Sequence, residues 1–157
     1  MPPEALAQPP FGQRVHATAL AVGEAGILIR GASGSGKSVL ALALIALAGH
    51  SGQFARLVGD DRVELVERGG RLVARPVAPL AGLVERRGLG LTPEPATPAV
   101  VLRLIVDLIG EEPARMPEPE DLVDALCGVD LPRLRVAGRA GDERLVLAAL
   151  ALFTQTG

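Results

Sequence analysis

The sequence is poor in aromatic residues, cysteine and lysine. It contains no Trp, no Tyr and only three Phe, so its core must be built from Leu, Val, Ala and Ile. That is feasible because 48% of the residues are hydrophobic. Cys127 is the only cysteine, which excludes an internal disulfide and a cysteine-rich metal site. A lone thiol suits a reducing compartment, and we expect the protein in the cytoplasm.

Excess charge and long apolar runs are also absent. The formal net charge is −2, which gives no general positive field for nucleic acid, and we expect no nucleic-acid partner. Residues 1–10 hold no basic residue and no long apolar run, so they do not predict a signal peptide. The apolar run over residues 39–48 is far shorter than the roughly 20 residues needed to cross a bilayer, and we expect no membrane partner.

The length of 157 residues suits a single domain over residues 1–157, with residues 1–13, rich in Pro and small residues, as a flexible lead-in. Apolar and turn patterns predict an α/β fold that is largely β. We expect strands at 15–22, 26–29, 56–58, 63–66, 71–74, 100–108 and 134–136, helices at 39–48, 121–126 and 143–153, and loops at 49–55 and 92–98. The helix over 39–48 is apolar nearly all round and is predicted to be mostly buried.

One motif predicts a phosphate site. The run Gly31-Ala32-Ser33-Gly34-Ser35-Gly36-Lys37-Ser38 fits the P-loop pattern G-x-x-x-x-G-K-[ST] without a mismatch. Its glycines let backbone N–H groups turn inward around phosphate oxygens, and the following helix directs its positive end at the same charge. An apolar strand before the loop and an apolar helix after it supply the context that the motif requires. The sequence therefore predicts a nucleoside triphosphate site.

The only lysine of the chain, Lys37, stands at the motif's lysine position. A compact ammonium group suits that position better than a planar guanidinium, although the chain contains 15 Arg. We expect Lys37 to bridge the terminal phosphates and the Ser38 hydroxyl to be a ligand to Mg²⁺.

Two adjacent carboxylates are expected to complete the site. Asp60 and Asp61 follow the short apolar run Leu57–Val58, about one helix and one loop after the P-loop. Carboxylates in that place can hold the metal ion and accept a proton from a hydroxyl nucleophile. A solvated turn is the competing interpretation, since Asp is common in turns.

With these residues in view, the chain resembles the catalytic domain of the HPr kinase/phosphorylase family. Four segments carry the resemblance and together span most of residues 14–136. His16 to Ser38 places a His one hairpin before the P-loop; Arg56 to Val63 is close to R-L-V-A-D-D-R-V; Val84 to Gly90 is close to L-E-I-R-G-L-G; Gly128 to Arg133 resembles G-V-E-I-P-K.

The resemblance implies roles for individual residues. His16 matches a catalytic histidine and Lys37 the P-loop lysine. Asp61 matches the proton acceptor of the phosphorylation reaction, with Asp60 as its close partner. Arg115 is the residue that matches a catalytic arginine. Ser38 and Glu85 match the magnesium ligands.

The resemblance also implies a fold and an activity. The fold would be the α/β P-loop kinase-like domain of the HPr kinase C-terminal type, a mixed sheet with flanking helices, in the short form without the family's N-terminal domain. The activity would be ATP- and Mg²⁺-dependent phosphorylation of a serine in an HPr-like phosphocarrier of the phosphotransferase system, with reverse phosphorolysis. The family's P-G-R-N loop, tied to dephosphorylation, is represented here only by Gly138-Arg139. Family members form homo-oligomers, including hexamers.

Two other functions stay open at this stage. A P-loop module could sense nucleotide and regulate a partner without phosphotransfer. A small-molecule kinase is the other alternative, although the few aromatic residues favour it little. A GTPase is excluded in its usual form, because the chain has no Asn and so cannot carry the guanine-reading N-K-x-D motif.

Overall fold

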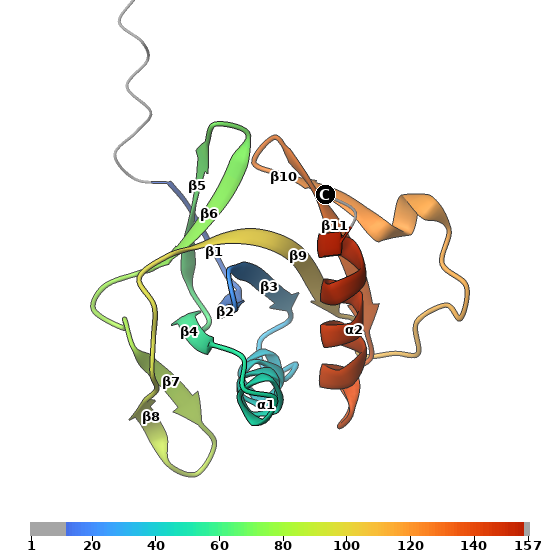
Figure 1. Ribbon diagram of the computed structural model, residues 1–157. Helices are drawn as coiled ribbons and strands as arrows, with labels where there is room; N and C mark the ends of the chain where they lie inside the picture. The colour runs from blue at the N-terminus through green and yellow to red at the C-terminus, as the bar shows by residue number, and fades with distance from the viewer. Residues whose placement is uncertain (1–11, 156–157) are drawn as a thin grey trace, which may run out of the picture.

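The computed structural model describes residues 12–155, so most of the predicted lead-in over residues 1–13 lies outside the described residues. Two helices and eleven strands are present in that part of the chain, with one short 3₁₀ turn (Figure 1). The helices are α1 (Lys37–His50) and α2 (Asp142–Gln155), and η1 is Pro119–Leu122. The strands are β1 (Gln13–Val15), β2 (Thr18–Val22), β3 (Ala25–Gly31), β4 (Ala55–Gly59), β5 (Val63–Arg68), β6 (Arg71–Pro76), β7 (Leu83–Arg86), β8 (Gly90–Pro93), β9 (Val100–Leu108), β10 (Val123–Leu126) and β11 (Val129–Val136).

Nine of the strands form one mixed sheet, and β7 and β8 form a separate hairpin. The order in the sheet is β1-β5-β6-β9-β3-β2-β4. One edge of β9 pairs with β3. Along its opposite edge, β6 pairs with the first residues of β9 and β11 pairs with the last four. β10 lies outside β11 and pairs with it. The predicted mixed sheet is therefore confirmed, and β9 is its central strand.

The direction of the strands gathers four loops at one edge. β9 and β11 run parallel to β3. β4 also runs in this direction, since it is antiparallel to β2, which is antiparallel to β3. The segments that follow β3, β4, β9 and β11 consequently leave the sheet at the same edge. In sheets of this kind ligands bind outside the carboxyl ends of the strands.

Both helices cover the same face of the sheet (Figure 1). On α1, the side chains of Leu40, Ala41, Leu44 and Ala48 repeat at helical spacing and pack against inward-facing residues of the sheet. Val146, Ala149 and Leu150 of α2 complete this core. The expected burial of α1 holds for this face only, because Val39 keeps 73% of its surface exposed.

The opposite face of the sheet has its own apolar core. It consists mainly of Ala, Val and Leu side chains from β2, β5, β6 and β9. β4 and β6 touch although three strands separate them in the sheet order, so the sheet curls around this core. Gly59 fits at the contact, because a Cβ there would lie 2.7 Å from Val63 Cγ1 and 3.5 Å from Pro76 Cα.

An ion-pair network ties the ends of β3, β9 and β11 together on that face. Arg30 donates to Asp107 through Nε at 2.7 Å and Nη2 at 2.9 Å, and to Asp124 at 2.8 Å. Arg133 Nε donates to Asp107 at 2.6 Å. Burial alone would raise the pKa of the Asp107 carboxyl, but the hydrogen bonds and charges of Arg30 and Arg133 outweigh it and lower that pKa. The contacts of Arg30 with Asp107 and Asp124 raise the pKa of this guanidinium, which directly precedes the P-loop.

Several predicted elements differ from those observed. The expected helix over residues 121–126 is wrong, because η1 ends at Leu122 and residues 123–126 form β10. The loop over 49–55 is shorter, since α1 continues to His50 and β4 begins at Ala55. The first two residues of the predicted loop over 92–98 belong to β8. The single strand expected over 15–22 is divided at His16 into β1 and β2. In the described part of the chain, no helix is long and apolar enough to span a membrane.

Candidate active site

The P-loop connects β3 to α1 and needs glycine for two different reasons. A Cβ at Gly31 would lie 2.5 Å from Ser35 Oγ and 3.0 Å from Leu108 Cβ, so no larger residue fits there. Gly34 and Gly36 have φ values of 79° and 102°, a region that L side chains rarely adopt. The motif residues thus take the compact turn that the sequence predicts.

The beginning of α1 is suited to an anion. Within residues 12–155 no side chain caps this helix, and its first turn contains no acidic residue. Its first N–H groups and the positive end of its dipole therefore remain available to a negative ligand. Ser35 Oγ is buried in the loop without a hydrogen-bond partner in the described part of the chain. A buried hydroxyl of this kind requires a partner, which a phosphate oxygen can supply.

Lys37 lies at the centre of the site with only 6% of its surface exposed. Its Nζ donates to the Gly31 carbonyl at 3.0 Å and to the Ala32 carbonyl at 3.2 Å, and it lies 3.7 Å from Asp61 Oδ1. These contacts hold the ammonium group beside the loop that the motif predicts for phosphate.

Asp60 is held by three donors from three different elements. Ser38 Oγ donates to its Oδ1 at 2.6 Å and Thr18 Oγ1 donates to the same atom at 3.0 Å. The backbone N–H of Glu85 donates to Oδ2 at 3.1 Å. The Asp60 carboxylate therefore links α1, β2 and β7 and stands directly beside the hydroxyl predicted to bind Mg²⁺.

Asp61 faces solvent next to the side chains of Lys37 and His16. Its Oδ1 lies 3.7 Å from Lys37 Nζ and 4.0 Å from His16 Nδ1, and the Asp61 side chain is 56% exposed. Its backbone takes the left-handed conformation, with φ of 63°, and its N–H donates to Thr18 Oγ1 at 3.1 Å. Asp tolerates this conformation better than most residues. The turn directs the two neighbouring carboxylates to different places.

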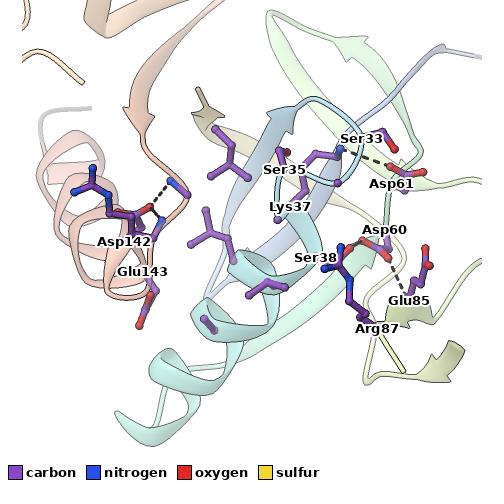
Figure 2. A pocket seen from close by; sticks show the side chains of 18 of the residues that line it. Ser33, Ser35, Lys37, Ser38, Asp60, Asp61, Glu85, Arg87, Asp142 and Glu143 are labelled. Atoms are coloured by element: carbon purple, nitrogen blue, oxygen red, sulfur yellow. Dashed lines mark hydrogen bonds and ion pairs between the residues drawn. The ribbon is translucent and has the colours of Figure 1, made fainter. Parts of the chain in front are cut away.

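These groups line a cavity of about 700 Å³ (Figure 2). Its lining includes Ser33–Ser38 of the P-loop. It also includes the three carboxylate residues Asp60, Asp61 and Glu85, and we call these three the acidic wall. His16 lies at the border of the cavity through its contact with Asp61. Arg115 is not among the lining residues and lies exposed in the segment between β9 and η1.

The other side of the cavity is formed by Gly138–Glu143, which we call the second wall (Figure 2). It joins β11 to α2, and Asp142 Oδ2 accepts from the N–H groups of Gly138 at 2.8 Å and Arg139 at 2.7 Å. Arg139 pairs with Glu112 at 2.5 Å, and both side chains are about two-thirds exposed. Sequence reasoning noted Gly138-Arg139 only as a remnant of a family loop and assigned nothing to Asp142 or Glu143.

Comparison with known proteins bears on the site and the fold together. A family model described as the HPr Serine kinase C-terminal domain matches residues 8–93. The HPr kinase/phosphorylase of Clostridium beijerinckii is 44% identical over 78 residues, covering 50% of this chain and 24% of that protein. The enzyme of the same name from Clostridium tetani is 39% identical over 97 residues, covering 62% of this chain and 30% of that protein. The chain thus aligns with less than a third of the length of these curated relatives.

A solved structure extends the likeness over nearly the whole chain. The HPr(Ser) kinase/phosphatase from Coxiella burnetii superposes with a TM-score of 0.68 at 23% identity, covering 92% of this chain and 90% of that one. At that identity the superposition shows a shared fold, and it confirms the predicted fold type. The family match covers more than half of the chain and includes the P-loop, the acidic pair and Glu85. This chain therefore belongs to the HPr Serine kinase C-terminal domain family.

Proposed function

We propose that this protein transfers the γ-phosphoryl group of ATP to a serine hydroxyl of an HPr-like phosphocarrier of the phosphotransferase system. The position of Asp61 carries the proposal, because its exposed carboxylate lies 3.7 Å from Lys37 Nζ beside the P-loop. The description of the family, HPr Serine kinase, and the names of the relatives, HPr kinase/phosphorylase, support a serine of HPr as the acceptor.

The triphosphate binds to the P-loop, Gly31–Ser38, and to the beginning of α1. Lys37 exchanges its two carbonyl contacts for phosphate oxygens, which are stronger partners for an ammonium group. Because Lys37 is almost fully buried, its charge acts in a medium where water screens it little.

Ser38, Asp60 and Glu85 would hold Mg²⁺. Within residues 12–155 no group of three or more His, Cys, Asp or Glu is arranged to hold a metal ion. The set of one hydroxyl, from Ser38, and two carboxylates, from Asp60 and Glu85, fits Mg²⁺, which commonly takes one or two carboxylates and completes its shell with water and substrate phosphates. The 2.6 Å contact between Ser38 and Asp60 shows two hard oxygen donors side by side. When bound, Mg²⁺ would neutralise charge on the phosphates.

Asp61 accepts the proton of the attacking serine. As that proton leaves, serine Oγ forms a bond to the γ-phosphorus, and the bond from this phosphorus to the β,γ-bridging oxygen breaks, which releases ADP. His16 borders the same carboxylate and is proposed to position it or to contact the transferred group. For Arg115 to act as the catalytic arginine, the segment that follows β9 must move toward the cavity.

The reverse reaction is a second candidate for the same site. In phosphorolysis, inorganic phosphate would attack phosphoserine and yield serine and pyrophosphate. The observation that favours it is the position of Gly138-Arg139, which lines the same cavity as Lys37 and Asp61. Arg139 can leave its exposed pair with Glu112 at little cost and turn to an anion.

Two further properties are proposed with this activity. The protein would act in the cytoplasm, where a phosphocarrier of the phosphotransferase system works. It would assemble as a homo-oligomer, up to a hexamer, as its family does.

Identification of the acceptor tests the proposal. The protein is incubated with Mg²⁺, γ-labelled ATP and, in parallel, an HPr-family carrier, the same carrier with its target Ser replaced by Ala, and a panel of metabolites. The proposal predicts label on the carrier serine only. Label on a metabolite would indicate the small-molecule kinase. ATP binding without any transfer would indicate the nucleotide sensor.

A further inference from the structure

The cavity extends to both sides of the P-loop, and the proposed reaction uses only one of them. In the sheet, β4 lies two strands from β3 on one side and carries Asp60 and Asp61 at its end. β11 lies two strands from β3 on the other side and leads into the second wall. At about 4.8 Å per strand, these two strands are about 19 Å apart across the site. An extended nucleotide can occupy such a span.

The chemistry at the acidic wall fixes the direction of the nucleotide. The γ-phosphate must lie near Asp61, since this carboxylate takes the proton from the serine hydroxyl that attacks the γ-phosphorus. The P-loop and Lys37 hold the phosphates next to it. The nucleoside must then lead away from Asp61, and the remaining part of the same cavity lies toward Gly138–Glu143 (Figure 2).

One side of that remaining space is apolar. Val39 and Ala43 of α1 are among the residues that line the cavity, at positions i and i+4 on one helical face, and Leu40 lies beneath them in the core. Val39 is 73% exposed, so its apolar surface borders the cavity without a cover. A flat, largely apolar ring placed here would cover this exposed surface, and the small side chain of Ala43 leaves room for it.

The other side carries two carboxylates, Asp142 and Glu143, beside Arg139. Asp142 Oδ2 accepts from two backbone N–H groups of the turn, and Glu143 Oε2 accepts from the N–H of Gly141 at 3.0 Å. These contacts fix the two carboxylates and leave the second oxygen of each for another donor. Carboxylates repel phosphate but accept from hydroxyl groups, as the acidic residue of dinucleotide-binding folds does with ribose. Asp142 and Glu143 therefore suit a sugar better than a phosphate, whereas Arg139 of the same wall can reach toward the phosphates.

From this geometry we infer that the second wall and the Val39–Ala43 face of α1 form the nucleoside subsite, with Glu143 accepting from a ribose hydroxyl and Ala43 making room for the base. The inference rests on the proposed function, since it assigns the far end of the same nucleotide. It names specificity residues that the catalytic assignments do not include.

Calorimetric titration of the whole protein with Mg²⁺ and three probes tests this subsite. The probes are ATP, 2′,3′-dideoxy-ATP and inorganic tripolyphosphate, which has no nucleoside. Glu143→Ala should weaken ATP binding roughly tenfold, as expected for loss of a hydrogen bond to a charged group, and should leave tripolyphosphate unchanged. The preference of the unmodified protein for ATP over the dideoxy analogue should disappear in this variant.

A second variant approaches the subsite from the apolar side. Ala43→Met keeps a good helix former but fills the space, so it should weaken ATP and not tripolyphosphate. The controls are Ala46→Met, exposed on the same helix, and Glu120→Gln, an exposed carboxylate outside the cavity. Neither control should change the binding of any probe.

The outcomes separate the subsite from the proposed function. If both variants bind ATP and tripolyphosphate as the unmodified protein does, the nucleoside lies elsewhere and the subsite is wrong while the kinase proposal stands. Equal losses for ATP and tripolyphosphate would assign the second wall to phosphate and also overturn the inference. If the unmodified protein binds neither probe, both the subsite and the proposed function are wrong.

Discussion

At the scale of single residues, Thr18 is the main addition that the structure makes to the site. Its hydroxyl is fully buried, donates to Asp60 Oδ1 and accepts from the Asp61 N–H, so it fixes both carboxylates at once. The P-loop and the acidic pair could be predicted because each is a local pattern with a known chemical use. Thr18 could not, because its contact with Asp60 spans 42 positions and depends on the pairing of β2 with β4. The only signal was one polar residue at the head of an apolar strand.

Thr18→Val tests this role with a side chain of similar shape. It leaves the Asp61 N–H without its acceptor and Asp60 with one donor fewer, so we expect a loss of about 1 to 3 kcal/mol in unfolding free energy. Misplaced carboxylates should slow phosphotransfer roughly 10- to 100-fold. Thr18→Ser, which restores the hydroxyl, should recover most of the transfer rate. Equal rates for the Val and Ser variants would show that the hydroxyl does not position the acidic pair.

At the scale of elements, the failed prediction at residues 121–126 has a clear cause. Their pattern suits a short helix, but Cys127 and Gly128 have φ values of 51° and 78°. Two consecutive residues with positive φ form the two-residue turn that a β-hairpin favours, and Leu126 accordingly pairs with Val129. The hairpin outweighs local helix propensity. By contrast β9 occupies the predicted range, 100–108, because four of its nine residues are β-branched Val or Ile.

The network around Asp107 is the element-scale contact with a predictable pH dependence. Asp107→Asn removes the counter-charge of Arg30 and Arg133 and should cost about 3 kcal/mol of unfolding free energy at pH 7. Because the folded state lowers the pKa of Asp107, this stabilisation is complete above the unfolded-state pKa of about 3.9. It is lost as the pH falls further, through the folded-state pKa.

Urea unfolding at pH 7, 5 and 3 checks this dependence. The difference between the unmodified protein and Asp107→Asn should be the same at pH 7 and 5 and smaller at pH 3. Asp130→Asn, an exposed carboxyl on β11, serves as the control and should have little effect at any pH. A difference that stays constant down to pH 3 would mean that the charge of Asp107 contributes nothing.

At the scale of the whole molecule, the site is a product of topology. Four strands that point the same way bring together segments as far apart in the chain as the P-loop and residues 138–143. The sequence predicts most of these strands but not their order, and therefore not that Glu143 and Asp61 face one cavity from opposite sides. The same limit applies to Arg115, whose predicted role depends on a segment that the sheet places beside the site rather than in it.

Assembly is a further whole-molecule prediction. We expect the homo-oligomer that is proposed above together with the kinase activity. Light scattering coupled to size-exclusion chromatography should give a multiple of the chain mass of 16.2 kDa. A mass of one chain at micromolar concentration would contradict the proposed assembly.

The most direct test of the central claim is single-turnover transfer from γ-labelled ATP to an HPr-family carrier by the unmodified protein and by Asp61→Asn. Asn also tolerates the positive φ at position 61, so the variant removes the base and keeps the turn. The account predicts label on serine with the unmodified protein, a rate at least about 100-fold lower with the variant, and equal ATP affinity for both. Transfer by Asp61→Asn at the unmodified rate would contradict the role of Asp61, and no transfer by either protein would contradict the kinase activity itself.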